Sequence, residues 1–151
     1  MNSHNPFIYE PTQDQDLYLL VHSFDNCEFT LTIIDEGTEY VELQDTKPFT
    51  YLFDDGEKEM KFEFKLKEKE DVNFNLIGPV NELNLVVMND ERWTDDNRGE
   101  GQASTEGYLS FKKEDISSLN FVIKVEKKEE FLKKYIHFTL LVSTKEGNVR
   151  L

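Results

Sequence analysis

Residues 58–77 read KEMKFEFKLKEKEDVNFNLI and contain two runs in which apolar and polar residues alternate. In the first run, 60–66, lysine and glutamate separate the apolar residues, and in the second, 72–76, asparagine separates them. A period of two places one face of a β-strand on a core and the other face in water. The stretch therefore predicts two half-buried strands, at 58–67 and 71–77.

The same alternation continues on both sides of this stretch, and phenylalanine, valine, isoleucine and threonine dominate it, as is typical of strands. It predicts about ten strands, at 17–23, 28–34, 39–44, 49–53, 58–67, 71–77, 82–88, 108–111, 119–126 and 135–144. Short connections with turn chemistry, such as Asp54-Asp55-Gly56 and Gly78-Pro79, join many of them. We therefore expect an all-β, antiparallel β-sandwich of jelly-roll type with little or no helix.

The centres of the best alternating runs predict the core. The expected core residues are Phe62, Phe64, Phe74, Leu76, Leu85, Phe121, Ile123, Phe138 and Leu140. The charged segment 126–134 allows either a single helical turn or a solvated loop, and a solvated loop is favoured.

Length and charge exclude several classes of function. The chain has 151 residues, 17 Lys and Arg, and 31 Asp and Glu, so its net charge is 17 − 31 = −14. This charge argues against a nucleic-acid partner and against an anionic membrane surface. No apolar run approaches the ~20 residues of a membrane span, so membrane insertion is not expected. A single cysteine allows no internal disulfide.

Two segments near opposite ends of the chain are similar to each other. Residues 19–23 read LLVHS and residues 140–144 read LLVST, and after a turn 28–31 read EFTL and 148–151 read NVRL. The offsets are 140 − 19 = 121 and 148 − 28 = 120 residues. A tandem repeat and a chance likeness of two hairpins both remain open at this point. A repeat would make 1–36 a polar tail plus the closing hairpin of a preceding unit, and 37–151 the next unit.

The predicted hairpin 17–34 carries an apolar face too large to leave in water. That face consists of Leu17, Leu19, Val21, Phe29, Leu31 and Ile33. We expect it to dock beside the strands of 39–53, or to pair with an edge strand of another copy in a strand-exchanged dimer or chain.

From residue 48 to residue 145 the order of features resembles the bacterial pre-peptidase C-terminal (PPC) domain. The resemblance is carried by MKFEFKL (60–66), VNFNLIGPVNELNLVVMND (72–90), Trp93, GYLSFKKED (107–115) and YIHFTLLVS (135–143). It implies a jelly-roll sandwich that serves as an accessory or array module of secreted and cell-surface proteins. An extracellular or cell-surface location is thus expected from the resemblance, and a cytoplasmic one if Met1 is the true start. Where the family often has calcium-binding aspartates, this chain has Asn81, Glu82 and Asn84.

The connection 89–107 is the candidate functional segment, because a loop of 19 residues inside a compact domain is usually functional or disordered. Its only tryptophan could present a platform to a ligand, or fold back and plug the end of the sandwich, which is the favoured alternative. The candidate ligand-binding residues are Arg92, Trp93, Asn97 and Tyr108. The candidate calcium ligands are Asp90, Asp95 and Asp96, since calcium takes six to eight oxygen ligands.

No arrangement of nucleophile and base suggests catalysis, because the histidines and Cys27 lack suitable neighbours in the pattern. The sequence therefore predicts a non-catalytic spacer or interaction module of a larger, repeat-bearing extracellular protein, with a protein or glycan surface as its partner. A calcium-dependent or carbohydrate-binding module that uses the loop 89–107 is the alternative.

Overall fold

The computed structural model describes residues 9–10, 13–14, 16–29, 31–35 and 37–144. The chain divides into two compact units, Met1–Leu31 and Thr32–Leu151. Among the described residues no helix is long and apolar enough to cross a membrane.

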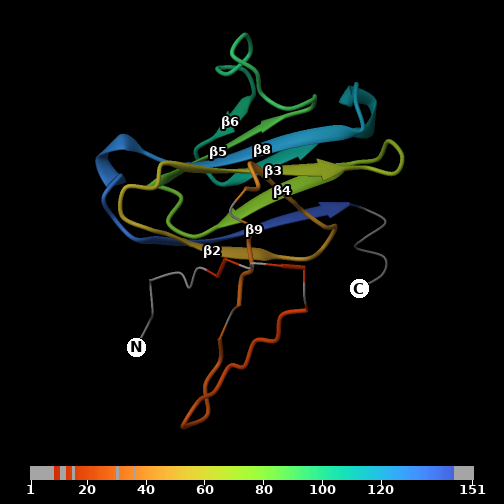
Figure 1. Cartoon of the computed structure of the whole chain (residues 1–151). Helices are drawn as coiled ribbons and strands as arrows, with labels where there is room; N and C mark the ends of the chain where they lie inside the picture. Colours follow the sequence, from red (N-terminus) through yellow and green to blue (C-terminus); the bar gives the residue numbers. More distant parts are fainter. Residues whose placement is uncertain (1–8, 11–12, 15, 30, 36, 145–151) are drawn as a thin grey trace. The chain divides into compact units, whose positions relative to one another are not determined.

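The second unit is a sandwich of two β-sheets (Figure 1). One sheet has five strands, in the order β1 (Tyr40–Glu42), β3 (Glu59–Lys65), β8 (Asn120–Lys127), β5 (Leu83–Met88) and β6 (Gln102–Ser104). The other has four, in the order β2 (Phe49–Phe53), β9 (Ile136–Thr144), β4 (Val72–Ile77) and β7 (Tyr108–Phe111). The expected all-β sandwich is therefore confirmed.

Successive strands cross between the two sheets at every step except β5 to β6, as in a jelly roll. All neighbouring strands are antiparallel except β1 and β3, which run parallel with Val41 opposite Phe62. The expectation of antiparallel pairing is wrong for this pair. Its cause is the crossover through β2 in the other sheet, which returns the chain to the first sheet in the same direction.

All nine residues expected in the core are buried. The two sheets meet through aromatic rings, and the Phe74 ring of β4 lies 5.3 Å from the Phe121 ring of β8. In the five-stranded sheet Phe62 stands opposite Ile123, and Phe64 stands opposite Phe121, so the alternating faces coincide across the ladder. The faces that the period of two predicts for these strands are thus the faces that the structure buries.

Other details differ from the sequence predictions. In the described parts of 17–23 and 28–34 no strand is assigned, whereas β6 was not predicted. Two short 3-10 turns, Lys113–Asp115 and Glu129–Phe131, lie in connections, and the second falls in the segment expected to be a solvated loop. Residues 148–151 lie outside the described part, and the division at residue 36 and the docking of the hairpin remain predictions.

Lys127 holds two connections together at one end of the sandwich. Its side chain is buried, and its Nζ donates hydrogen bonds to the backbone carbonyls of Asp54 (2.6 Å), Leu132 (2.9 Å) and Lys134 (2.7 Å). All three N–H donors of the ammonium are therefore used. Removal from water lowers the pKa of Lys127 below its usual range, while nearby carboxylates, Glu57 first, oppose this change.

Candidate functional site

A second, small apolar cluster lies on the outer face of the five-stranded sheet. Its buried members are Tyr40 of β1, Val122 of β8 and Met88 of β5. Phe121 and Ile123, which flank Val122, belong to the main core between the sheets, so Val122 faces away from that core. The outer face of this sheet therefore carries one apolar patch, and its burial requires another segment of the chain to pack on it.

The segment that covers this cluster is the connection after β5, and Asn89 fixes its direction. The Asn89 side-chain amide donates to the carbonyls of Ser118 (2.7 Å) and Asn120 (2.9 Å). Its Oδ1 accepts from the backbone N–H groups of Ser117 (2.9 Å) and Ser118 (3.3 Å). These four contacts attach the start of the connection to the segment that leads into β8.

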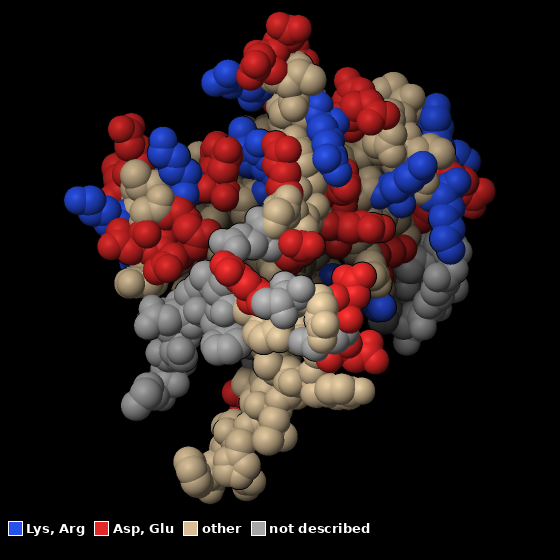
Figure 2. Space-filling model, viewed as in Figure 1, with Lys and Arg blue, Asp and Glu red and all other residues tan. Residues whose placement is uncertain are grey.

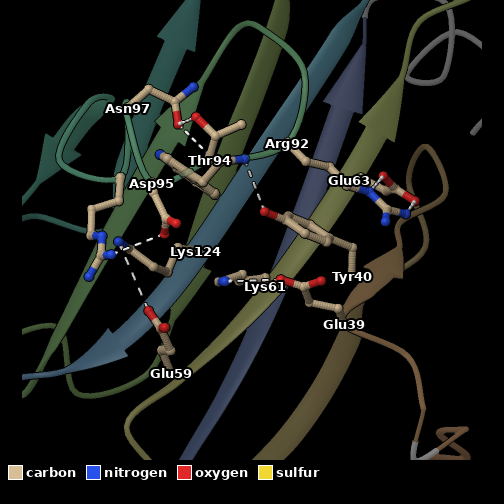
Figure 3. Close-up of polar contacts among 12 residues, drawn as sticks. Glu39, Tyr40, Glu59, Lys61, Glu63, Arg92, Thr94, Asp95, Asn97 and Lys124 are labelled. Carbon is tan, nitrogen blue, oxygen red and sulfur yellow. Dashed lines mark hydrogen bonds and ion pairs between the residues drawn. The ribbon is translucent and has the colours of Figure 1, made fainter.

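Arg92 lies over this face and contacts two neighbouring strands (Figure 3). Its Nε and Nη2 donate to the two carboxylate oxygens of Glu63 on β3, at 3.2 and 3.1 Å. Its guanidinium carbon is 4.7 Å from the centre of the Tyr40 ring, within the range of a cation–π contact. The hydrogen bond and the charge of Glu63 raise the pKa of Arg92. The paired arrangement fixes the plane of an otherwise exposed guanidinium.

Trp93 packs, partly buried, against the same cluster. Its backbone N–H donates to the Tyr40 hydroxyl (3.1 Å), and its indole Nε1 donates to the Glu100 carbonyl (2.9 Å). The Lys124 ammonium is 5.2 Å from the centre of the indole. Trp93 thus folds back, as expected, but onto the outer face of a sheet and not into the end of the sandwich. The reason is that β1 supplies Tyr40 there.

Gly101 returns the connection to the sheet. Its φ is +127°, and a Cβ atom at this position would lie 2.8 Å from Val86 Cγ1. Only glycine combines this backbone conformation with such a close approach. The glycine therefore allows β6 to begin directly beside β5, next to Trp93.

A hollow of about 280 Å³ lies beside Arg92. Phe64, Phe121 and Val122 are also among its lining residues. Its charged lining residues are Glu42, Glu63, Asp90, Glu91, Lys65 and Arg92, which leaves it two charges negative. A cationic group of a partner is the complement of such a lining.

The other predicted ligand-binding residues do not join this site. Asn97 Oδ1 accepts from the backbone N–H and the hydroxyl of Thr94 and so closes a turn within the loop. Tyr108 is exposed on β7 in the other sheet, where its hydroxyl donates to Asn73 Oδ1 (3.0 Å). Arg92 and Trp93 therefore lie together, while Tyr108 belongs to a different surface.

The predicted calcium ligands are not brought together either. Asp90 Oδ1 accepts from the Glu91 backbone N–H (2.8 Å), and Asp95 pairs with Arg98 (3.1 Å). In the part of the chain that the structure describes, no three His, Cys, Asp or Glu side chains are placed to hold a metal ion. Calcium binding by Asp90, Asp95 and Asp96 remains a prediction.

Sequence reasoning missed Tyr40, Glu63 and Lys124. The alternation in 39–44 already carried a signal, because Val41 and Leu43 on one face leave Tyr40 on the other. The pattern gave no indication that the loop would cover Tyr40, because that contact joins residues far apart in the chain.

Neither a family model nor a curated protein sequence matches the chain. Among solved structures it is similar to PliG from Aeromonas hydrophila, a periplasmic lysozyme inhibitor of g-type lysozyme. The TM-score is 0.55 at 15% identity, over 70% of this chain and 96% of PliG. It also aligns with the pre-peptidase C-terminal domain of collagenase from Bacillus anthracis, with a TM-score of 0.49 at 9% identity over 72% of this chain and 99% of that domain. The likeness to PliG shows a shared β-sandwich fold.

Proposed function

We propose that the chain is a non-catalytic β-sandwich interaction module of a larger extracellular or cell-surface protein. It binds a protein partner through the outer face of the five-stranded sheet, at Arg92 and Trp93. The observation that carries the proposal is the grouping of Arg92, Trp93 and Tyr40 on one face. Arginine, tryptophan and tyrosine are the residues that most often dominate the binding energy of protein interfaces.

The charge of the chain supports a basic partner surface. The net charge is −14, and acidic side chains are spread over the strands of the sandwich (Figure 2). The hollow beside Arg92 has the same sign, with Glu42, Asp90 and Glu91 at its lining. Opposite charge on the partner speeds association and selects against acidic proteins.

The likeness to PliG supports a protein as the partner class. PliG has the same kind of fold and inhibits a g-type lysozyme, so a sandwich of this shape is compatible with binding another protein. A g-type lysozyme, the enzyme that PliG inhibits, is therefore a reasonable first protein probe.

The test measures binding of the full chain to a g-type lysozyme and to lysine- and arginine-rich peptides by calorimetry. Arg92→Ala and Trp93→Ala are each expected to weaken binding at least about tenfold, as hot-spot truncations do. Arg98→Ala is the matched control, because Arg98 lies in the same loop and forms its ion pair there with Asp95.

Equal changes in binding for Arg92→Ala and Arg98→Ala would refute the site, because a diffuse attraction does not distinguish the two arginines. A thermal-shift experiment with calcium and a panel of glycans addresses the alternative function of the same loop. Stabilisation by either ligand, without binding of any basic probe, would replace the proposed function by a calcium- or carbohydrate-binding one.

A further inference from the structure

The segment 17–23, LYLLVHS, exposes an apolar face, and none of the described residues between 9 and 29 belongs to a buried core cluster. Leu17, Leu19 and Val21 are 58%, 60% and 46% exposed. No residue from 17 to 23 is charged, although charged residues make up 32% of the chain. Exposed apolar sets of this kind usually mark a surface that meets a partner.

Strand β9 contains the same pattern in a buried setting. With an offset of 121 residues, Leu19, Leu20 and Val21 are identical to Leu140, Leu141 and Val142. In β9 the inward residues Phe138, Leu140 and Val142 are each 0% exposed. Their counterparts are Leu17, Leu19 and Val21, so every exposed apolar residue of one face has a core residue as its equivalent.

The position of β9 in the sheet indicates which neighbours a strand of this sequence requires. β9 pairs with β2 over residues 49–53 and with β4 over residues 72–77, so it is a central strand of the four-stranded sheet. As a central strand it has a ladder on each side, and its outward residues from Thr139 to Ser143 are half-buried, with Leu141 among them apolar. The segment 17–23 has this character, since Tyr18 and Leu20 on its second face are apolar as well.

An edge strand would have a different composition. Edges are commonly protected by lysine and other charges, and 17–23 has none. A second copy of this chain fits poorly as the receptor, because β9 occupies the equivalent place there and both copies carry a charge of −14.

We infer that residues 17–23 are the counterpart of β9 in a second β-sandwich of the same kind. The partner is a sandwich whose four-stranded sheet lacks this central strand and receives it from this chain. Ser23 then stands where Thr144 donates its hydroxyl to the Asp45 carboxylate, so a hydroxyl is kept at that position. The inference concerns a different segment from the proposed function and does not depend on it.

The first experiment places the sequence of 17–23 in the position of β9 in the full chain. The chimera carries Phe138→Leu, Thr139→Tyr, Ser143→His and Thr144→Ser. It is expected to fold, with circular dichroism and a dispersed NMR spectrum like those of the parent, and to lose little more stability than Phe138→Leu alone. The control takes the sequence of 18–24 instead, through Phe138→Tyr, Thr139→Leu, Leu141→Val, Val142→His and Thr144→Phe.

This shift by one residue exchanges the inward and outward faces, so the control is expected not to fold. An unfolded first chimera beside a folded Phe138→Leu variant would overturn the inference. Two chimeras that fold equally well would overturn it too, because the position would then accept any apolar strand.

The second experiment asks whether the receptor lies outside this chain. In the full chain, Leu19→Asp with Val21→Asp is expected to leave the melting temperature unchanged, whereas Leu140→Asp with Val142→Asp is expected to abolish the cooperative transition. A large loss of stability from the first pair would show that the segment docks on its own sandwich, and the inference would be wrong.

Discussion

The hydroxyl of Tyr40 on strand β1 accepts a hydrogen bond of 3.1 Å from the backbone N–H of Trp93. This contact joins the edge of the five-stranded sheet to the loop that carries both central residues of the proposed site. The same ring lies beneath the Arg92 guanidinium. Tyr40 therefore positions both residues of the loop. Its oxygen holds Trp93, and its ring face holds Arg92.

Tyr40→Phe tests this double role. The variant keeps the ring and loses the hydroxyl, so it is expected to lower the free energy of unfolding by about 1 kcal/mol, the usual net contribution of a hydrogen bond. The emission of Trp93 should shift to longer wavelength as the loop loosens. Tyr108→Phe, which removes a hydroxyl from the other sheet, is the control and should leave the emission unchanged.

The sequence predicted the sandwich better than the site, and particular residues show why. The burial of Phe62 and Phe64 follows from a period of two, which is a local property of the chain. The pairing of Arg92 with Glu63 depends on the path of a loop, which no local pattern specifies. Tyr108 illustrates the same limit, since its place after the loop in sequence suggested a surface that it does not share.

The segment 17–23 shows a second kind of limit. Its alternation predicted a strand, yet no strand is assigned there. A strand forms where a neighbour completes its hydrogen bonds and covers its apolar face. The alternating pattern shows that the segment is suited to be a strand, but the strand forms only where a neighbouring strand pairs with it.

Truncation of the central rings tests the core. Phe74→Ala and Phe121→Ala are each expected to cost roughly 3–5 kcal/mol of unfolding free energy, since both side chains are fully buried. Because the two rings are in contact, the double variant should lose less than the sum. Chemical denaturation provides the measurement, and Phe24→Ala, at a fully exposed ring, is the control. Additive losses would mean that the two rings do not pack on each other.

Lys127→Met tests the buried ammonium that joins the two connections. The variant keeps most of the side-chain volume and leaves the carbonyls of Asp54, Leu132 and Lys134 without this donor. Asp54 and Leu132 are half-buried and Lys134 is exposed, so water can reach some of these carbonyls. A loss of about 1–3 kcal/mol is therefore expected in denaturant unfolding. Lys133→Met, at an exposed position nearby, should be close to neutral. A neutral Lys127→Met would show that water replaces the ammonium at these carbonyls.

Tyr51 should make the stability of the sandwich depend on alkaline pH. Its hydroxyl donates to both carboxylate oxygens of Glu57, at 2.8 and 3.0 Å. Burial, and then the hydrogen bond to Glu57, raise the pKa of Tyr51 above its usual range.

In the unfolded chain this tyrosine loses its proton near about pH 10, while the folded state still holds it. The folded state therefore binds more protons above that pH, and stability falls as the pH rises further. The contribution is complete below about pH 10 and is lost on the way up to the raised pKa of the folded state. Urea unfolding between about pH 9 and about pH 11 measures how steeply the unfolding free energy falls with pH. Tyr51→Phe should make this fall shallower. Tyr108→Phe keeps Tyr51 and should leave the slope unchanged. A slope that is equally steep in Tyr51→Phe would assign the alkaline loss to other groups and would contradict this role of the Glu57 contact.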